Sequence, residues 1–389
     1  MASFPPAEKE LLPIMRRVLS LFAGLQFGLL AVLPAQADTL SFPVLVPLTG
    51  FLALEGTSQR NGAVLALKEA VPGTAVSEVV DTGTSPEAAV TALERAAGSG
   101  TVAAVAASML GTQMLAMLPL AVELKLPLVT VSGTAAITEQ GNPWVFRFFP
   151  GDAVTKTAHA RYVVEELGRK RPAVIYQTTA YGQSGRTHLE AAFKVLGVAP
   201  VFEEGVDPAA KDLLPVLTKA LAAKPDVLVL HLHAGPTALL LRQAATSGVD
   251  LPIVAGSAMH QPSTAALLEP SELKGVCAET AASPVSGGTP AMEAFTAAYR
   301  AAFGKEPDAF ALGQYDGMRM VLAAVKAGAG TAEDVRKALA GGTHKGVAMT
   351  YASDGKGNMA HSAVIVCYDG TSRVPALVKR YDDVTGPAK

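Results

Sequence analysis

Two short polar segments follow apolar runs of the sequence and could bind a small anion. One holds Ser132 and Thr134 around a glycine, and the other holds Ser108, Gly111 and Thr112; neither carries a charge. Hydroxyls are short donors, and glycine lets another molecule approach the backbone closely. Backbone N–H groups at the start of a helix favour an anion. The segments therefore predict a site that holds a small carboxylate without a lysine.

The usual catalytic motifs are missing from the sequence. The segment "YGQSGRT", residues 181–187, resembles a nucleophile elbow, but its G-x-S-G order is one residue short of G-x-S-x-G. No G-x-x-x-x-G-K-S/T segment occurs, so a phosphate-binding loop is not indicated. A secreted hydrolase would need a nucleophile and a base in one site, and we find no such pair. We therefore expect no catalysis and no cofactor.

Two histidines lie close together in "LHLHAG". His231 and His233 are two residues apart on a predicted strand, so both point to the same face. Such a pair could ligate a metal, but no third ligand or nearby carboxylate accompanies it in the sequence. The other interpretation is that the pair lines a cavity at the end of the strand. We favour that interpretation and predict no metal site.

Strand-like and helix-like segments alternate along most of the chain. Apolar runs such as 126–131, 172–177 and 226–233 indicate strands, and segments with helical spacing separate them. This alternation predicts parallel sheets with helices on both faces, and nearly all-apolar strands fit such burial. In these α/β folds ligands bind beyond the carboxyl ends of the strands, where both polar segments lie. The elements are too many for one sheet, so we expect two α/β lobes.

The composition narrows the class of partner. The chain has 389 residues, of which 50% are hydrophobic and 17% charged, which is ample for more than one domain. The net charge of −2 gives no basic surface, so nucleic acid is not an expected partner. Aromatic residues make up 6% of the chain, which disfavours stacking platforms for bases or sugars.

The N-terminus has the pattern of a secretory signal peptide. Arg16 and Arg17 precede an apolar stretch at 18–33, and an A-x-A site ends at Ala37. This pattern predicts that residues 1–37 are a signal peptide and that the mature protein is periplasmic. A retained membrane anchor is the alternative, although the apolar stretch is near the short end for a membrane span.

Cys277 and Cys367 are the only cysteines of the chain. In an exported protein two cysteines can form one disulfide, but the sequence does not show that they meet. The segments "GVCAE" and "VIVCY" both have the pattern of buried strands, so two buried free thiols are the alternative. Both states stay open at the level of the sequence.

Six segments in order carry the signatures of one family. "PLTGFLALEGTSQRNGAVLALKEA" is similar to the family's opening, and "DTGTSPEAAVTALERAA" to its D-x-x-x-x-P-x-x-A segment. "LPLVTVSGTAA" is similar to G-V-P-x-I-S-P-x-A-T, and "NPWVFRFFPGDA" to the F-R-x-x-P-x-D crossover. "YGQSG" and "QYDGMRMVLAAVKAG" match two further signatures. Over nearly all of its mature length the chain resembles the periplasmic solute-binding proteins of branched-chain amino acid type ABC importers.

The resemblance implies roles for particular residues. Ser132 and Thr134 match residues that hold the α-carboxylate and ammonium of the ligand from the first lobe. Tyr181 matches a tyrosine of the second lobe that closes over the ligand, and His233 is the best candidate for another contact from that lobe. The remaining loop of the first lobe contributes Ser108, Gly111 and Thr112.

The chain departs from this family at two positions. Members that bind α-amino acids often carry an acidic residue, which pairs with the ammonium, in the loop that here spans residues 255–260. That loop holds no acid here, and Ser257 and Ala258 are nearest to the position. Glu55 stands where some members have an aromatic residue. Because an unpaired buried ammonium is costly, either Glu55 supplies the missing carboxylate or the ligand has no amine.

The resemblance also implies a fold, namely the type I periplasmic-binding fold. This fold has two doubly wound parallel-sheet lobes joined by a three-crossover hinge. We expect lobe one to comprise residues 38–152 and 280–345, and lobe two residues 153–279 and 346–389. Both cysteines then belong to lobe two, which favours their pairing.

The implied function is solute capture for an ABC importer. We expect the chain to bind a small amino acid, or a related carboxylate or amide, between its lobes by hinge closure. It would deliver this solute to a membrane permease and act as a monomer, without cofactor or metal. A ligand-sensing receptor on the same fold, which reports amides or amino acids to a regulator, is the alternative function. The predicted signal peptide favours import.

If the signal peptide is removed on export, the mature protein begins at or near Asp38. N-terminal sequencing and intact-mass measurement of the exported protein check this. A mature chain that retains residues 18–33 contradicts the prediction and supports the membrane anchor. Translation from Met15 instead of Met1 changes the precursor but leaves the mature N-terminus unchanged.

Overall fold

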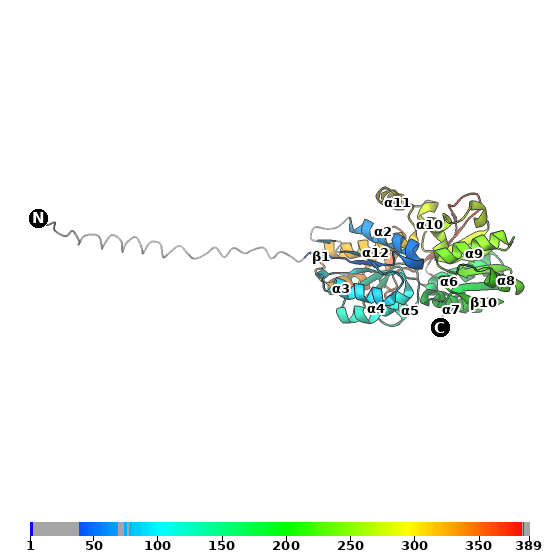
Figure 1. The fold of residues 1–389 in the computed structure, drawn as a ribbon, viewed down its shortest axis with the longest axis horizontal. Helices are drawn as coiled ribbons and strands as arrows, with labels where there is room; N and C mark the ends of the chain where they lie inside the picture. Colours follow the sequence, from blue (N-terminus) through cyan, green and yellow to red (C-terminus); the bar gives the residue numbers. More distant parts are fainter. Residues whose placement is uncertain (3–38, 69–73, 76–77, 383, 385–389) are drawn as a thin grey trace. The chain divides into compact units, whose positions relative to one another are not determined.

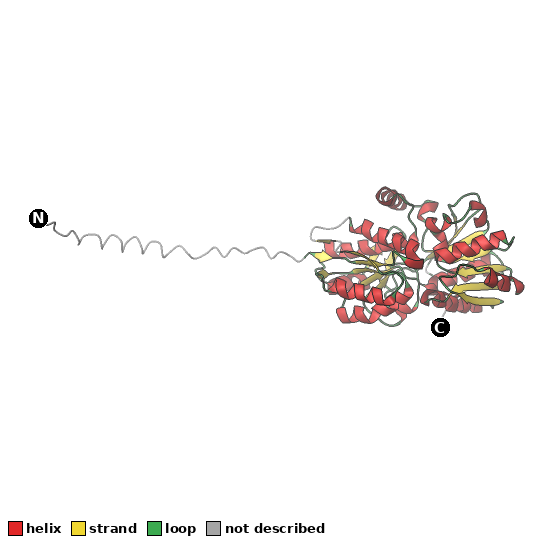
Figure 2. Cartoon of the chain, viewed as in Figure 1, coloured by secondary structure: helices red, strands yellow, loops and turns green. Residues whose placement is uncertain are grey.

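Two large β-sheets, each covered by helices on both faces, organise the chain after residue 38 (Figures 1 and 2). The computed structural model describes residues 1–2, 39–68, 74–75, 78–382 and 384. Apart from Met1 and Ala2, the expected signal peptide lies outside the described residues. None of the described helices combines the length and the apolar character needed to cross a membrane.

The first sheet has five parallel strands in the order β4-β2-β6-β7-β8, namely Val79–Asp81, Val44–Val46, Val105–Ala107, Leu128–Thr130 and Val145–Arg147. Successive side chains of β2 point to opposite faces of the sheet and pack in different hydrophobic cores. Val44 and Val46 pack with the helices α2 (Ala53–Leu67) and α12 (Ala309–Lys326). Leu45 packs with α3 (Pro86–Ala97) and α4 (Gly111–Leu124). Burial on both faces is the reason why these strands are nearly all apolar.

The second sheet has seven strands in the order β10-β9-β11-β12-β13-β16-β17, namely Phe202–Val206, Pro172–Gln177, Val227–His231, Ile253–Ala255, Val276–Thr280, Ala363–Cys367 and Ala376–Tyr381. The first five are parallel, whereas β16 runs antiparallel to β13 and β17 antiparallel to β16. One face packs against α8 (Leu214–Ala222) and α9 (Ala234–Thr246). The other packs against α6 (Asp152–Arg161) and α7 (Ala180–Val195). The expected class, two doubly wound parallel-sheet lobes, is confirmed, with one antiparallel pair added at an edge.

The chain passes between the two sheets three times: after β8, after β13 and before β16. Between β13 and β16 lie α11 (Pro290–Phe303), α12, α13 (Ala332–Gly341) and a hairpin of β14 (Thr343–Lys345) with β15 (Thr350–Ala352). Tyr351 of this hairpin and Met359 after it pack in the core of α2 and α12, although both were expected in lobe two. Because Thr39–Lys389 forms one compact unit, the exact lobe boundaries stay a prediction.

Short elements complete the described chain. A small parallel sheet has the order β3-β1-β5, with strands Thr74–Ala75, Leu40–Ser41 and Thr101–Val102. The short helical segments are α5 (Ala136–Glu139), α10 (Pro262–Ala265), η1 (Gly50–Leu52), η2 (Tyr162–Glu166), η3 (Ser257–His260), η4 (Pro270–Leu273) and η5 (Pro284–Ser286). Of these, α5 and η3 matter for function because they follow the strands β7 and β12 at the edge where the site lies.

A disulfide joins Cys277 of β13 to Cys367 of β16. The two residues are directly opposite each other in the antiparallel register, so strand pairing itself brings the sulfurs together. The described chain therefore has the bond rather than two free thiols. The bond spans a sequence separation of 90 residues, which includes α11, α12, α13 and the β14–β15 hairpin. It thus links the strand that leaves the second sheet to the strand that returns to it.

Replacing both cysteines by serine removes this long-range link. We expect the free energy of unfolding to fall by about 2–4 kcal/mol, because the bond restricts the unfolded chain. Denaturant unfolding of the variant measures the fall. Thiol titration of the unfolded, unreduced parent should find no free thiol, and two free thiols there would contradict the prediction.

Candidate functional site

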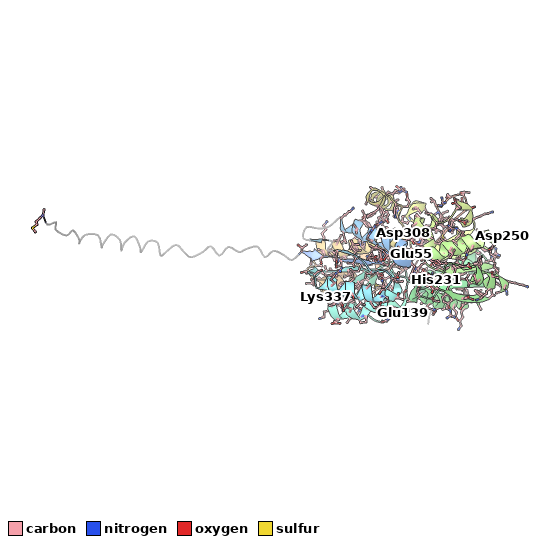
Figure 3. The ribbon with its side chains drawn as sticks, viewed as in Figure 1. Glu55, Glu139, His231, Asp250, Asp308 and Lys337 are labelled. Carbon is pink, nitrogen blue, oxygen red and sulfur yellow. A yellow bond between two sulfur atoms is a disulfide. The ribbon has the colours of Figure 1, made fainter. Side chains whose placement is uncertain are left out.

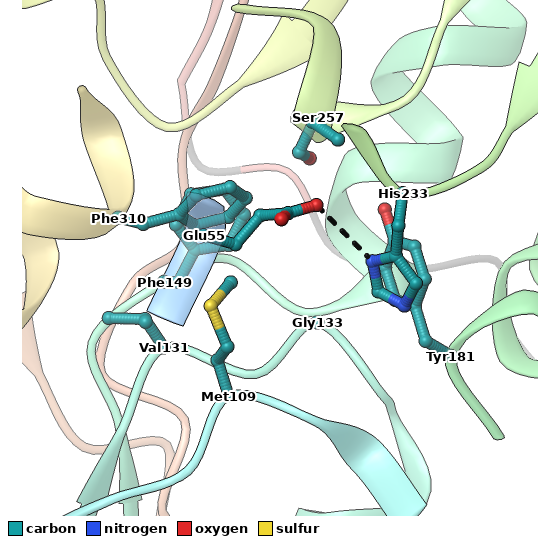
Figure 4. Close-up of a pocket in the computed structure, with 10 residues that line it drawn as sticks. Glu55, Met109, Val131, Gly133, Phe149, Tyr181, His233, Ser257 and Phe310 are labelled. Atoms are coloured by element: carbon teal, nitrogen blue, oxygen red, sulfur yellow. Dashed lines mark ion pairs between the residues drawn. The ribbon is translucent and has the colours of Figure 1, made fainter. Parts of the chain in front are cut away.

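A cavity lies where the carboxyl ends of strands from the two sheets face each other. Residues that follow β6, β7 and β8 line it from the first sheet, and residues that follow β11 and β12 line it from the second. The lining residues are Glu55, Met109, Val131, Gly133, Phe149, Tyr181, His233, Ser257, Ala258 and Phe310. In Figure 4 the Glu55 carboxylate points toward the His233 ring, with Met109, Val131 and Gly133 on one side and Ser257 on the other. This is the edge at which α/β sheets bind ligands.

The residues proposed from the sequence fall into three groups around this cavity. Glu55, Tyr181, His233 and Ser257 line it. Ser132 and Thr134 do not line it themselves but flank the lining residue Gly133, and both are buried. Ser108, Gly111 and Thr112 are also absent from the lining.

The cavity is small in this arrangement of the chain. Its volume of about 20 Å³ is room for a single water molecule. Anything as large as an amino acid therefore enters only when the elements around the cavity move apart. Among the hydrogen bonds between described elements of the two sheets, four oppose that movement: Ala234 N–H to Glu55 Oε1 (2.8 Å), Gln261 Nε2 to Asp308 Oδ2 (2.6 Å), Ala309 N–H to His260 Nε2 (2.9 Å) and Ala135 N–H to Ser184 Oγ (2.9 Å).

Glu55 lies in the first turn of α2 (Figure 3). Its side chain is buried, with only 1% exposed. Its Oε1 accepts the hydrogen bond from Ala234, at the N-terminus of α9, and its Oε2 has no hydrogen-bond partner. Burial raises the pKa of Glu55 to about 7; the Ala234 hydrogen bond works against this rise, and the charge of Asp308 adds to it. Near neutral pH this carboxyl group therefore exchanges its proton readily.

His233 lies beside Glu55 without forming an ion pair. Its Nδ1 is 3.7 Å from Glu55 Oε1, the contact drawn as a dashed line in Figure 4. Burial lowers the pKa of His233 to about 3, so the ring is neutral at neutral pH. The contact therefore brings no positive charge to the carboxylate.

The ring of Tyr181 packs against both histidines of the "LHLH" segment. Its centroid is 3.9 Å from that of His231 and 4.8 Å from that of His233. His231 Nε2 donates a hydrogen bond to the backbone carbonyl of Tyr181 at 3.0 Å. The two imidazoles thus position an aromatic ring at the cavity. No described group of three or more His, Cys, Asp or Glu side chains is placed to hold a metal ion.

The loop that begins this site after β7 offers two hydroxyls. Ser132 Oγ and Thr134 Oγ1 are buried and have no hydrogen-bond partner. A Cβ atom at Gly111 would lie 2.0 Å from Thr134 Oγ1, so the glycine at the start of α4 makes room for this threonine. Gly111 therefore supports the site through packing. Buried hydroxyls without partners are costly unless another molecule bonds to them.

Arg147, which sequence analysis did not propose, holds this loop. Its guanidinium donates to the three carbonyls of residues 132–134 at 2.8–3.4 Å, to Thr138 Oγ1 at 2.8 Å, and through Nε to Asn358 Oδ1 at 3.0 Å. Burial lowers the pKa of Arg147 to about 10, so it is still charged at neutral pH. Because the C=O and N–H of a trans peptide point in opposite directions, the N–H groups that follow these carbonyls point away from Arg147.

Ser108 is directed into the protein instead of into the cavity. Its hydroxyl donates to Gln113 Oε1 at 2.5 Å and accepts from Leu110 N–H at 3.1 Å. The next residue, Met109, lines the cavity in its place. Thr112 follows in the first turn of α4 and is partly exposed.

The loop after β12 carries no acid, but the neighbouring strand supplies one beneath it. Glu279 of β13 accepts from Ser257 Oγ at 3.0 Å and is bonded to Lys156 and to His159 Nδ1. Burial opposes its ionisation, but the charge of Lys156 and the bond to His159 hold the pKa of Glu279 below its ordinary value. Glu279 is therefore an ionised carboxylate whose charge is already compensated within the protein.

Asp152 is another buried carboxylate near the loop. Its N–H donates to the carbonyl of Gly133 at 2.7 Å, and its Oδ2 has no hydrogen-bond partner. Burial raises the pKa of Asp152 to about 6, and the charge of Lys156 works against the rise. It does not line the cavity itself.

Comparison with known proteins agrees with this architecture. Residues 39–370 match the family model described as periplasmic binding protein. The chain is 25% identical over 242 residues to a leucine-, isoleucine-, valine-, threonine- and alanine-binding protein of Pseudomonas aeruginosa. That alignment covers 60% of this chain and 65% of the relative, so the chain spans slightly less than two thirds of it.

Solved structures have the same fold. The leucine-binding protein LivK of Thermotoga maritima superposes with a TM-score of 0.80 at 25% identity, over 88% of this chain and 99% of that one. A solute-binding protein of an ABC transporter from Rhodopseudomonas palustris, solved with 3,4-dihydroxybenzoic acid, gives a TM-score of 0.76 at 22% identity. That second comparison covers 90% of this chain and 98% of the other.

The raised pKa of Glu55 predicts that this residue destabilises the fold at higher pH. The carboxyl titrates near 4.5 when unfolded and near 7 when folded, so the folded protein binds more protons between these values and loses stability as pH rises. We expect Glu55→Gln to be more stable than the parent above pH 7, by up to about 3 kcal/mol, and equal to it near pH 4.5. Denaturant unfolding at both pH values measures this. An equal gain at both values contradicts it, and Glu123→Gln on the exposed face of α4 serves as control.

Proposed function

Because the chain belongs to the periplasmic binding protein family, we propose that it is the solute-binding component of an ABC importer. It is exported to the periplasm and captures a small amino acid, or a related carboxylate or amide, in the cavity between its sheets. It then delivers this solute to a permease in the membrane. Binding and release are its whole activity, with no covalent step.

The observation that carries this proposal is the set of unpartnered polar atoms around the cavity. Ser132 Oγ, Thr134 Oγ1, Glu55 Oε2 and His233 Nε2 are all buried without a hydrogen-bond partner. Buried polar groups in folded proteins are rarely left unpaired, so a cluster of them at a strand-end cavity favours a ligand that pairs with them. Hydroxyl donors from the loop at residues 132–134 suit a carboxylate, and Arg147 behind the loop adds a favourable positive charge.

The named relatives support an apolar amino acid as the first solute to test. The Pseudomonas protein is named for leucine, isoleucine, valine, threonine and alanine, and the Thermotoga structure for leucine. The apolar lining residues Met109, Val131 and Phe149 suit an aliphatic side chain. Because the Rhodopseudomonas structure contains an aromatic acid, acids without an amine are also tested, although that likeness extends to the fold alone.

Capture would proceed by opening and closing around the three chain crossings. Opening breaks the four hydrogen bonds between the sheets, including the one from Ala234 to Glu55. The solute binds first to the loop that Arg147 holds, where the hydroxyls are already in place. Closure then brings Tyr181 and His233 onto the solute and excludes water from it.

Screening against amino acids, amides, aromatic acids and dicarboxylates by thermal shift tests the function. We expect at least one class to raise the melting temperature, because a ligand at 100 times its Kd adds about 2.7 kcal/mol of stability. Thr134→Val should weaken binding of that compound about ten- to a hundredfold, since a hydroxyl bonded to a charged group contributes about 1.5–3 kcal/mol. Calorimetric titration measures the change.

Two controls separate binding from damage to the fold. Thr134→Ser keeps the hydroxyl and should bind within a few-fold of the parent. Thr134→Val removes a buried hydroxyl without a partner, so the unliganded variant should melt no lower than the parent. If Thr134→Val binds as tightly as the parent, the solute is not held at this loop.

A further inference from the structure

Glu55 differs from Glu279, the carboxylate that accepts from the lining residue Ser257, because Glu55 has no positive partner. Glu279 is bonded to both Lys156 and His159. Glu55 accepts the Ala234 N–H with one oxygen, and its Oε2 is unpartnered and buried. Among the described residues that line the cavity, none is Lys or Arg. The protein itself therefore leaves this carboxylate uncompensated.

The titratable groups that face Glu55 are neutral or negative. His233 is neutral, and burial holds the pKa of Tyr181 well above its usual value, so its hydroxyl stays protonated. Asp308, at the N-terminus of α12, adds a second carboxylate nearby, which accepts from Ser58 and Gln261. The buried cations of the surroundings are committed elsewhere, Lys156 to Glu279 and Arg147 to the loop carbonyls.

The two parts of the site therefore favour opposite charges. The loop at residues 132–134 has hydroxyl donors, and the Arg147 guanidinium lies behind it. Glu55 offers an acceptor with negative potential on the α2 side. A molecule with a negative and a positive end satisfies both parts, whereas a simple anion satisfies only one.

We propose that Glu55 is the specificity-determining residue of this cavity: its carboxylate binds a positively charged nitrogen, so the solute is an amino acid or a similar zwitterion. The inference rests on the proposed function and narrows its solute class. The Ala234 N–H fixes Oε1, which leaves Oε2 to accept from the ammonium.

Proton exchange distinguishes the two classes of solute. An ammonium beside Glu55 favours the ionised carboxylate, lowers the pKa of Glu55 below about 7, and releases a proton into neutral solution. An acid without an amine adds a second negative charge to the same cavity, so Glu55 must take up a proton. The sign of the exchange therefore reports whether a cation binds at Glu55.

The experiment compares matched pairs that differ only in the amine: L-leucine with 4-methylpentanoate, and L-phenylalanine with 3-phenylpropanoate. If the thermal-shift panel finds a different amino acid, the pair is built on that one. Calorimetric titration at pH 7 in phosphate and in Tris, which differ in ionisation enthalpy, gives the number of protons exchanged. We expect the amino acid to bind at least tenfold more tightly than its matched acid and to release about half a proton per molecule bound.

Two isosteric variants assign the effect to a residue. Glu55→Gln keeps an acceptor for Ala234 and should lose both the proton release and most of the preference for the amine. Asp152→Asn removes the other buried carboxylate with an unpartnered oxygen and should keep the proton release. Circular dichroism and melting curves verify that both variants are folded.

The possible outcomes separate this inference from the proposed function. Three results would overturn the role of Glu55 but leave solute binding intact. They are proton uptake with the amino acid, binding of the matched acid that is as tight or tighter, and proton release that persists in Glu55→Gln. If only Asp152→Asn loses the proton release, the cation binds at Asp152, and the role proposed for Glu55 is wrong. If no amino acid, amide or acid binds at all, the proposed function fails, and this inference fails with it.

Discussion

The buried guanidinium of Arg147 holds three segments of the site in fixed positions relative to one another. It bonds to the carbonyls of residues 132–134, to Thr138 of α5, and to Asn358 in the segment that leads back to the second sheet. The backbone repeats this link, because Arg147 N–H donates to the carbonyl of Gly357 and Met359 N–H to that of Arg147. Gly357 has φ +95°, and a Cβ there would lie 2.0 Å from the carbonyl oxygen of Val145, so only glycine allows this approach. The shape of the polar loop and the path of a crossing thus depend on one side chain.

Around that rigid loop the protein keeps polar atoms that its own fold does not satisfy. The hydroxyls of Ser132 and Thr134 and one oxygen of Glu55 are buried without partners, and each such group costs about 1–3 kcal/mol. The two sheets, buried on both faces by apolar side chains, supply the stability that offsets this cost. The same atoms that weaken the fold are the ones that a bound molecule can pair, so stability and recognition compete at this edge of the sheets.

The local pattern of the sequence was sufficient to predict part of this site. Ser132 and Thr134 stood out because uncharged hydroxyls follow an apolar strand, and Glu55 stood out because it departs from a family pattern. Ser108 illustrates the limit: near the end of a strand, adjacent residues face opposite sides, so an error of one residue exchanges Met109 for Ser108. Phe310 reaches the cavity from a helix far along the chain, and the disulfide depends on the register of β13 with β16. Both features depend on contacts between residues that are far apart in the sequence, and the spacing of neighbouring residues does not predict such contacts.

The four hydrogen bonds that close the cavity also set how often the protein is receptive. A solute can enter only the fraction of molecules in which Ala234 and Glu55, Gln261 and Asp308, and the other two pairs have separated. If opening precedes binding, a closed form favoured by about 2.7 kcal/mol slows association roughly a hundredfold. The affinity falls only through those contacts that the solute-bound form does not make again. The contacts of Gln261 with Asp308 and of Ala309 with His260, whose residues do not line the cavity, therefore set how quickly a solute is captured without altering the residues that line the site.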